Sequence, residues 1–175
     1  MRSVTLDTRF YLSCLFLFCT FALISCGRGG LTLPAHYDEA NTHMVNALDY
    51  KNEFTRWLND LSEQQRPTND EWLEALRLAE RAITEAKLVS QEFLSLAHPD
   101  LPSMWNGYFI PSMEKMHLYY FNGVSDPNFV KSPSTDEGMK QVNTILDAQA
   151  LNDLWGNWYD THRNEIRAGI RKLAQ

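Results

Sequence analysis

Apolar residues recur at spacings of three and four along two long segments of this 175-residue chain, and this period constrains the fold more than any other feature. In segment 36–61 the stripe includes one polar residue, Lys51, and otherwise consists of Tyr37, Ala40, Met44, Ala47, Phe54, Leu58 and Leu61. In segment 68–97 the polar member is Ser90, and the apolar members are Trp72, Leu76, Ala79, Ile83, Ala86, Phe93 and Ala97. Such spacing gathers side chains on one face of an α-helix. The pattern therefore predicts two long amphipathic helices.

Start and stop signals bound the second of these helices. Thr68 and Glu71 form a capping box, in which the hydroxyl accepts from the amide three residues on and the carboxylate bonds back. The helix should end at His98, because Pro99 follows it.

Two further helices are predicted in the second half of the chain. A short helix should span 111–121, with proline in its first turn and the pair Asn122–Gly123 as a left-handed stop. A second capping box at 134–137 begins the last helix, which should reach residue 173 with a bend or interruption between 147 and 153.

Strand-like alternation is missing from the sequence. Segment 119–123 could begin a hairpin, but no second strand follows it. We therefore predict an all-α, up-and-down bundle of about four main helices, formed by residues 35–175, with a short helix in the irregular, aromatic-rich region 101–133.

The N-terminus has the layout of an export signal. Arg2 and Arg9 precede an uncharged apolar stretch at 10–24, after which Ser25 and Cys26 follow. The run Leu23-Ile24-Ser25-Cys26 resembles the lipobox of bacterial lipoproteins. This resemblance implies cleavage between Ser25 and Cys26, and attachment of diacylglycerol and a further acyl chain, such as palmitate, to Cys26. Residues 1–25 would then be a signal peptide and residues 26–34 a flexible membrane tether.

Two other interpretations of the N-terminus remain. A plain transmembrane anchor needs about 20 apolar residues, and this stretch is shorter. An ordinary secretory cleavage after Gly27 would discard Cys26 and release the protein. Under the lipoprotein resemblance, Gly27 instead of aspartate after the cysteine favours the outer membrane of a Gram-negative cell.

The net charge and the number of cysteines exclude some classes of ligand and of cross-link. The chain has a net charge of −6, and removal of residues 1–25 takes away two basic and one acidic residue, which leaves 14 basic and 21 acidic residues and a net charge of −7. An acidic domain is a poor ligand for nucleic acid and for anionic lipid. Cys14 and Cys19 lie within the signal, so the mature chain keeps only Cys26 and forms no disulfide.

One segment is a candidate interaction surface. Aromatic and methionine side chains are dense between 104 and 121, where proline and glycine break the pattern. Such residues suit a partner or ligand surface. The other interpretation is that they cap the open end of the bundle. The residues predicted for the surface are Trp105, Tyr108, Phe109, Met113 and Tyr120.

Metal-binding patterns are weak in this sequence. His36, Glu39 and His43 share one helix edge, but a solvated helix end explains them as well. Glu114 and His117 form a single Glu-x-x-His pair, whereas a di-iron bundle needs two. We predict no metal and no cofactor.

Three polar residues lie on the otherwise apolar stripes of the predicted helices. Lys51, Ser90 and His162 would form a buried polar cluster if they met in one layer of the bundle. A satisfied core histidine and a lysine that reaches solvent are the commoner outcome.

The sequence contains no nucleophile motif of the Gly-x-Ser-x-Gly kind and no phosphate-binding loop. We therefore expect a non-enzymatic, lipid-anchored protein of the cell envelope that presents its helical domain to a partner protein. The alternative is a module that holds a small apolar ligand or a metal in the bundle core.

The lipobox resemblance gives a direct prediction. Cys26→Ala should block lipid labelling and leave uncleaved precursor, because the thiol is the group that takes the lipid. Mass spectrometry of the N-terminal peptide from host membranes measures both effects. Normal processing of the variant would contradict the lipoprotein interpretation.

Overall fold

The computed structural model describes residues 32–60, 67–124 and 136–175, without the side chains of 136–142 and 144–146. The lipobox at 23–26, the signal peptide and most of the tether lie outside these residues. The helices, with no strand among the described residues, are α2 (Ala35–Asp60), α3 (Asn69–Leu88), α4 (Gln91–Ala97), α5 (Leu101–Met104), the π-helix η1 (Trp105–Phe109), α6 (Ile110–Val124) and α7 (Asp136–Leu173). All of them belong to one unit, Leu33–Gln175.

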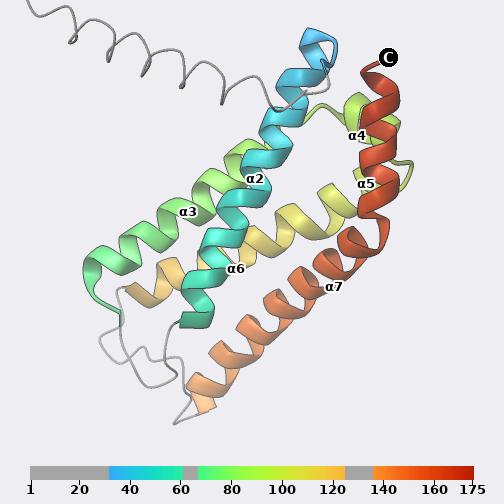
Figure 1. Cartoon of the computed structure of the whole chain (residues 1–175). Coiled ribbons are helices and arrows are strands. Elements are labelled where there is room, and N and C mark those ends of the chain that lie inside the picture. The colour runs from blue at the N-terminus through green and yellow to red at the C-terminus, as the bar shows by residue number, and fades with distance from the viewer. Residues whose placement is uncertain (1–31, 61–66, 125–135) are drawn as a thin grey trace, which may run out of the picture. The chain divides into compact units, whose positions relative to one another are not determined.

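Packing follows the chain order. Helix α2 packs along α3, α3 along α6, and α6 along α7, while α4 packs against α7 (Figure 1). The predicted all-α bundle is therefore confirmed.

The start of α3 is formed as predicted. The Thr68 hydroxyl accepts from the Glu71 amide at 3.3 Å, and a Glu71 carboxylate oxygen accepts from the Thr68 amide at 2.8 Å. Both bonds of the capping box are present.

The predicted helix 68–97 is divided into two. Helix α3 ends at Leu88, Val89 adopts an extended backbone, and Ser90 caps the start of α4. The Ser90 hydroxyl accepts from the amide of Phe93 at 3.4 Å. Serine competes with helical hydrogen bonding in this way, which is why it favours caps over helix interiors.

The region 101–124 is more helical than predicted. Pro102 occupies the first turn of α5, where its missing N–H is harmless. Pro111 follows the π-helix, in which the Ile110 amide bonds to the Trp105 carbonyl oxygen five residues back. This wider turn precedes the position at which proline would disrupt an α-helix. The predicted stop at Asn122–Gly123 is wrong, because Gly123 lies inside α6 without a left-handed φ.

A bend or an interruption was expected between 147 and 153, and the interruption is absent, because α7 is continuous from Asp136 to Leu173. Figure 1 shows the helix changing direction before its C-terminal turns. Thr161 and His162 each form a side-chain bond of 2.8 Å with the carbonyl oxygen four residues earlier. Such bonds commonly bend helices. The second predicted capping box begins at residues 134 and 135, outside the described residues.

Tryptophan side chains join the helices through the core. The Trp72 indole N–H donates to the Tyr120 carbonyl oxygen at 2.8 Å and ties α3 to α6. The Trp105 indole N–H donates to the Ala86 carbonyl oxygen at 2.9 Å. The Trp105 ring is stacked on Phe109 at 4.5 Å and meets the Trp155 ring edge-on at 5.3 Å.

The backbones of helices α4 and α7 are in close contact at Gly169. A β-carbon at this position would overlap the Ala97 carbonyl oxygen and lie 2.9 Å from the Ala97 carbonyl carbon. Only a residue without a side chain permits this contact between backbones.

We therefore expect Gly169→Ala to destabilise the protein by about 1–3 kcal/mol, because α7 must move away from α4. Gly156→Ala is the matched control on the same helix, where a β-carbon meets no atom within 4 Å. It should be neutral or stabilising by up to about 1 kcal/mol through helix propensity. Urea unfolding of the two variants compares these effects, and equal stability of the pair would contradict the packing described here.

Candidate functional site

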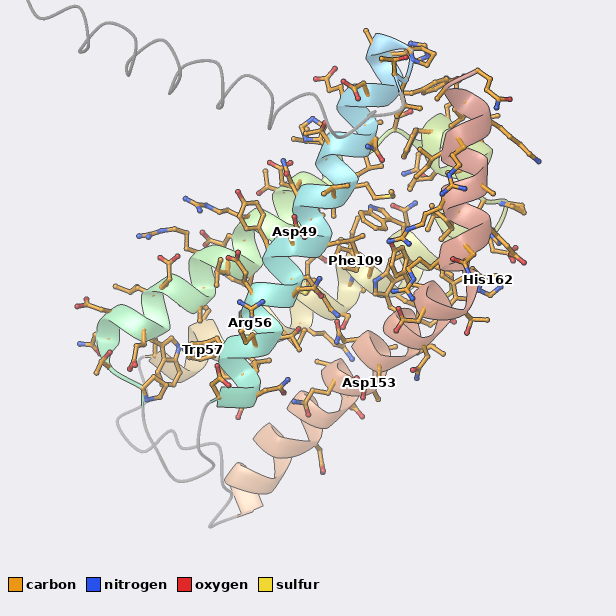
Figure 2. All side chains as sticks on the ribbon, in the orientation of Figure 1. Asp49, Arg56, Trp57, Phe109, Asp153 and His162 are labelled. Carbon is orange, nitrogen blue, oxygen red and sulfur yellow. The ribbon has the colours of Figure 1, made fainter. Side chains whose placement is uncertain are left out.

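A cleft of about 400 Å³ separates α2 from α7. Figure 2 shows Asp49 on α2, and Asp153 and His162 along α7. The α2 residues that line the cleft are Val45, Leu48, Asp49, Lys51 and Asn52. The α7 residues that line it are Trp155, Gly156, Tyr159, Asp160, Arg163 and Arg167.

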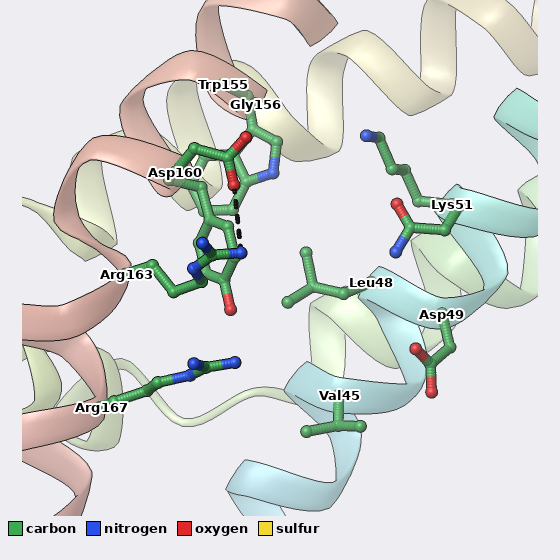
Figure 3. A pocket seen from close by; sticks show the side chains of 11 residues that line it. Val45, Leu48, Asp49, Lys51, Trp155, Gly156, Asp160, Arg163 and Arg167 are labelled. Atoms are coloured by element: carbon green, nitrogen blue, oxygen red, sulfur yellow. Dashed lines mark ion pairs between the residues drawn. The ribbon is translucent and has the colours of Figure 1, made fainter.

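Helical periodicity places these side chains on facing sides. Tyr159, Arg163 and Arg167 are four residues apart and therefore share one face of α7. In Figure 3 both arginines extend from α7 toward α2, where Val45 and Leu48 face them.

Lys51 reaches the cleft from the apolar stripe of α2. It lies one turn after Ala47, which is fully buried, so its stem starts at the edge of the core. Figure 3 shows its side chain extending toward α7 near Trp155. The ammonium group has no carboxylate within 4 Å and no hydrogen bond among the described residues.

Burial governs the charge state of Lys51. The loss of water around the half-buried ammonium lowers the pKa of Lys51, and the negative charges of Asp153 and Asp160 oppose this shift. The downward shift prevails, so the protein keeps this cation in a place that disfavours its charged form.

The two arginines differ in their partners. Arg163 forms a 3.8 Å ion pair with Asp160, and both groups are largely exposed. Arg167 has neither a hydrogen bond nor an ion pair within the described part of the chain. Burial raises the pKa of Tyr159 between them, and the positive charges of Arg167 and Arg163 oppose that shift.

The cleft is locally positive on an acidic chain. Its lining has three basic side chains and two carboxylates, Asp49 and Asp160, which gives a local charge of +1 against −6 for the whole chain. Guanidinium groups bind carboxylates and phosphates through paired hydrogen bonds. This chemistry suits an anionic ligand group.

The aromatic segment predicted as a surface is part of the core. Four of its side chains are at most 1% exposed, and Tyr108 is half-buried; the four are Trp105, Phe109, Met113 and Tyr120. The reason is that α6 is packed between α3 and α7, and η1 is packed against α6 and α7. Burial also raises the pKa of the Tyr120 hydroxyl strongly. The burial of these side chains therefore supports a place in the core and not on a partner surface.

The polar residues on the apolar stripes have separate neighbours. Ser90 caps α4, Lys51 lines the cleft, and His162 lies against His98 at 5.0 Å between ring centroids. Lys51 was recognisable from the sequence, but its surroundings were not. The spacing of four residues between Arg163 and Arg167 was a signal that these side chains share a face of the last helix.

The residues of the first candidate metal pattern contact other groups. His43 lies 2.8 Å from a Glu85 oxygen and 3.9 Å from Glu39, while His36 is packed against Tyr37.

The two residues of the Glu-x-x-His pair also contact separate partners. Glu114 pairs with Lys87 at 2.7 Å, and His117 with Glu80 at 3.2 Å. A different group of potential ligands converges in the described residues, formed by His98, His162 and Glu165.

Comparison of the chain with known protein families, with curated protein sequences and with solved structures gives no match. None of the described helices combines the length and the apolar character that crossing a bilayer requires.

The charge of Lys51 leads to a pH-dependent prediction. Because the folded state lowers the pKa of Lys51, it binds this proton less tightly than the unfolded state does. The resulting penalty is complete below the folded-state pKa and disappears as pH rises toward the ordinary lysine value. Lys51→Met should therefore be more stable than the wild type at pH 7, and its advantage should shrink by pH 10.

Urea unfolding at both pH values measures this difference. Lys115→Met is the matched control, because Lys115 is exposed and has no ion pair in the described residues. It should match the wild type at both pH values. A Lys51→Met variant that is less stable than the wild type at pH 7 would contradict the prediction.

Proposed function

We propose that the protein is a lipid-anchored, non-enzymatic component of the bacterial cell envelope, and that its helical domain binds an acidic segment of a partner protein in the cleft between α2 and α7. The anchor is the lipid on Cys26, and the lipobox resemblance supports it. The outer membrane is the favoured location, because Gly27 follows the cysteine.

The cation of Lys51 is the observation that carries the proposal. Its ammonium is half-buried, lacks a carboxylate within 4 Å among the described residues, and stays in a setting that lowers its pKa. A buried charge of this kind is destabilising until an opposite charge lies beside it. A carboxylate from a partner supplies that charge. Because it favours the charged form of the ammonium, it would raise the pKa of Lys51 toward its ordinary value.

The arginines provide the second point of attachment. Arg167 is exposed and has no internal carboxylate partner in the described residues, so it can bind an anion without breaking an existing ion pair. Arg163 lies one turn away on the same face, and its guanidinium group already forms an ion pair with Asp160. Two guanidinium groups on one helix face suit a run of acidic side chains better than a single small ion.

Apolar groups in the cleft favour a peptide segment over a free anion. Val45 is 44% exposed at the wall formed by α2, and Tyr159 is half-buried opposite it. These surfaces offer contacts for the carbon atoms of a peptide segment. The short tether also favours a partner protein in the envelope. The eight residues from Gly27 to Pro34 reach at most about 30 Å, so they hold the domain near the membrane and its proteins.

The alternative from the sequence was a small apolar ligand or a metal in the bundle core, and the apolar-ligand form of it has less support. The core around Trp105 is filled by the rings of Phe109 and Trp155. The cleft between α2 and α7 has charged side chains in its lining.

Photo-cross-linking in the native host tests the proposal. A photoreactive residue at Asn52, which is exposed at the cleft, should form an adduct with an envelope protein. Arg167→Glu should reduce the adduct at least about tenfold, since it replaces attraction by repulsion at a contact position. Arg171→Glu is the matched control, because Arg171 is exposed one turn further along α7 and lies outside the cleft lining.

The two variants decide the outcome. An adduct that survives Arg167→Glu, or that Arg171→Glu reduces equally, would show that the cleft does not bind an acidic segment. If no protein adduct forms but purified chain binds citrate in a manner that depends on Arg167, the ligand is a small free anion and the partner-protein proposal is wrong.

A further inference from the structure

Three potential metal ligands meet where the end of α4 touches α7. One ligand atom each of His98, His162 and Glu165 lies within 4.8 Å of the other two. His98 is 8% exposed, His162 is half-buried, and the Glu165 side chain is 68% exposed. The three side chains thus range from a buried imidazole, that of His98, to an exposed carboxylate, that of Glu165.

The fold brings these residues together through rigid contacts. His98 is the C-cap of α4, its backbone amide bonds to the Leu94 carbonyl oxygen at 3.0 Å, and Pro99 ends the helix. Gly169 holds the neighbouring Ala97 against α7. His162 and Glu165 are three residues apart and therefore project from the same side of α7.

The hydrogen bond of His162 to the backbone leaves one ring nitrogen available to a metal. Its Nδ1 atom lies 2.8 Å from the Trp158 carbonyl oxygen, which can only accept, so Nδ1 is the protonated nitrogen. This leaves a lone pair on Nε2. Metal-binding histidines are commonly oriented in this way, with the second nitrogen donating to a carbonyl oxygen.

Trp158 positions both imidazoles. Its ring is stacked on His162, with centroids 4.6 Å apart, and meets His98 edge-on at 5.3 Å. The indole fixes the ring planes and covers the site on one side. Residues that hold ligands in this way strengthen metal affinity.

His98 and Glu165 already have a spacing suitable for metal ligands. The Nε2 atom of His98 lies 3.1 Å from a Glu165 oxygen. Bond lengths of 2.0–2.1 Å to zinc in a tetrahedral site place neighbouring ligand atoms about 3.3 Å apart. The exposed Glu165 side chain can adjust to bring the group to that geometry.

One hydrogen bond must change when a metal binds. The Asp100 amide donates to Nδ1 of His98 at 3.2 Å, so Nε2 carries the ring proton and donates it to Glu165. A metal on Nε2 takes the place of this proton, which moves to Nδ1, and the Asp100 amide turns to water. Asp100 is exposed, so water is available there.

We propose that His98, His162 and Glu165 form a binding site for a borderline divalent transition-metal ion, with Zn²⁺ as the representative. Two imidazoles and a carboxylate suit such ions, whereas Ca²⁺ and Mg²⁺ prefer oxygen ligands throughout. Three protein ligands leave a fourth position for water or for a group from outside. The bound ion links the end of α4 to α7.

Metal titration of the untagged full chain, purified from host membranes with free thiols alkylated, tests this site. After treatment with chelator, the protein should bind one equivalent of Zn²⁺, and its Tm should rise with Zn²⁺ concentration because only the folded state holds the three ligands together. Co²⁺ should give the visible absorption of a tetrahedral nitrogen and oxygen site.

Variants separate this site from incidental binding. His162→Ala and Glu165→Gln should weaken Zn²⁺ binding by at least about tenfold. His117→Ala is the matched control, because His117 also contacts a single glutamate, at 3.2 Å, but belongs to no converging group of three among the described residues. It should bind Zn²⁺ like the wild type.

Three results would overturn the proposal: no saturable Zn²⁺ binding, binding that survives both His162→Ala and Glu165→Gln, or an equal loss in His117→Ala. Glu165 is largely exposed, so Glu165→Gln should fold even if a histidine variant does not. Circular dichroism without metal checks the fold of each variant. In a variant that is folded but binds weakly, the loss is attributable to the missing ligand.

Discussion

The indole of Trp105 is the contact on which the rest of the domain depends. Its N–H donates to the Ala86 carbonyl oxygen near the end of α3, and its ring contacts the rings of Phe109 and Trp155. One side chain therefore supplies a hydrogen bond to α3 and apolar contact to α7, while its backbone begins the π-helix. The same carbonyl oxygen also accepts from the Val89 amide at 3.4 Å, and the indole adds a shorter second bond at 2.9 Å. Carbonyl groups at helix ends often accept from such outside donors, because the helix leaves them unpaired.

The sequence predicted the parts of the fold that local rules determine. The stripe of α2 and the capping box at Thr68 and Glu71 are formed as expected, because they depend only on residues within a few turns. The division at Ser90 and the helical course through Pro111 were not predicted. Both depend on tertiary contacts: the segment after α3 is held by Trp105, and the π-turn accommodates a proline that would otherwise mark a helix start.

The candidate sites were less predictable, for a similar reason. A run of aromatic residues has the same pattern whether it lines a surface or a core. The packing of α6 between α3 and α7, and of η1 against α6 and α7, decides between the two. Lys51 was recognisable as a polar break in an apolar stripe, but the face of α7 opposite it was not. His98 was noted only as the end of a helix, since its partners lie more than 60 residues later in the chain.

The position of Trp155 late in the chain has a consequence for the order of folding. The rings of Trp105 and Phe109 find one of their main neighbours about 50 residues further on, so α2 to α6 can associate early while a side of their core still lacks its cover. Contacts of such long sequence separation form slowly, because a large loop must close before they are gained. A chain in which α7 is not yet available therefore exposes aromatic surface, and the native state is reached only after this helix has docked.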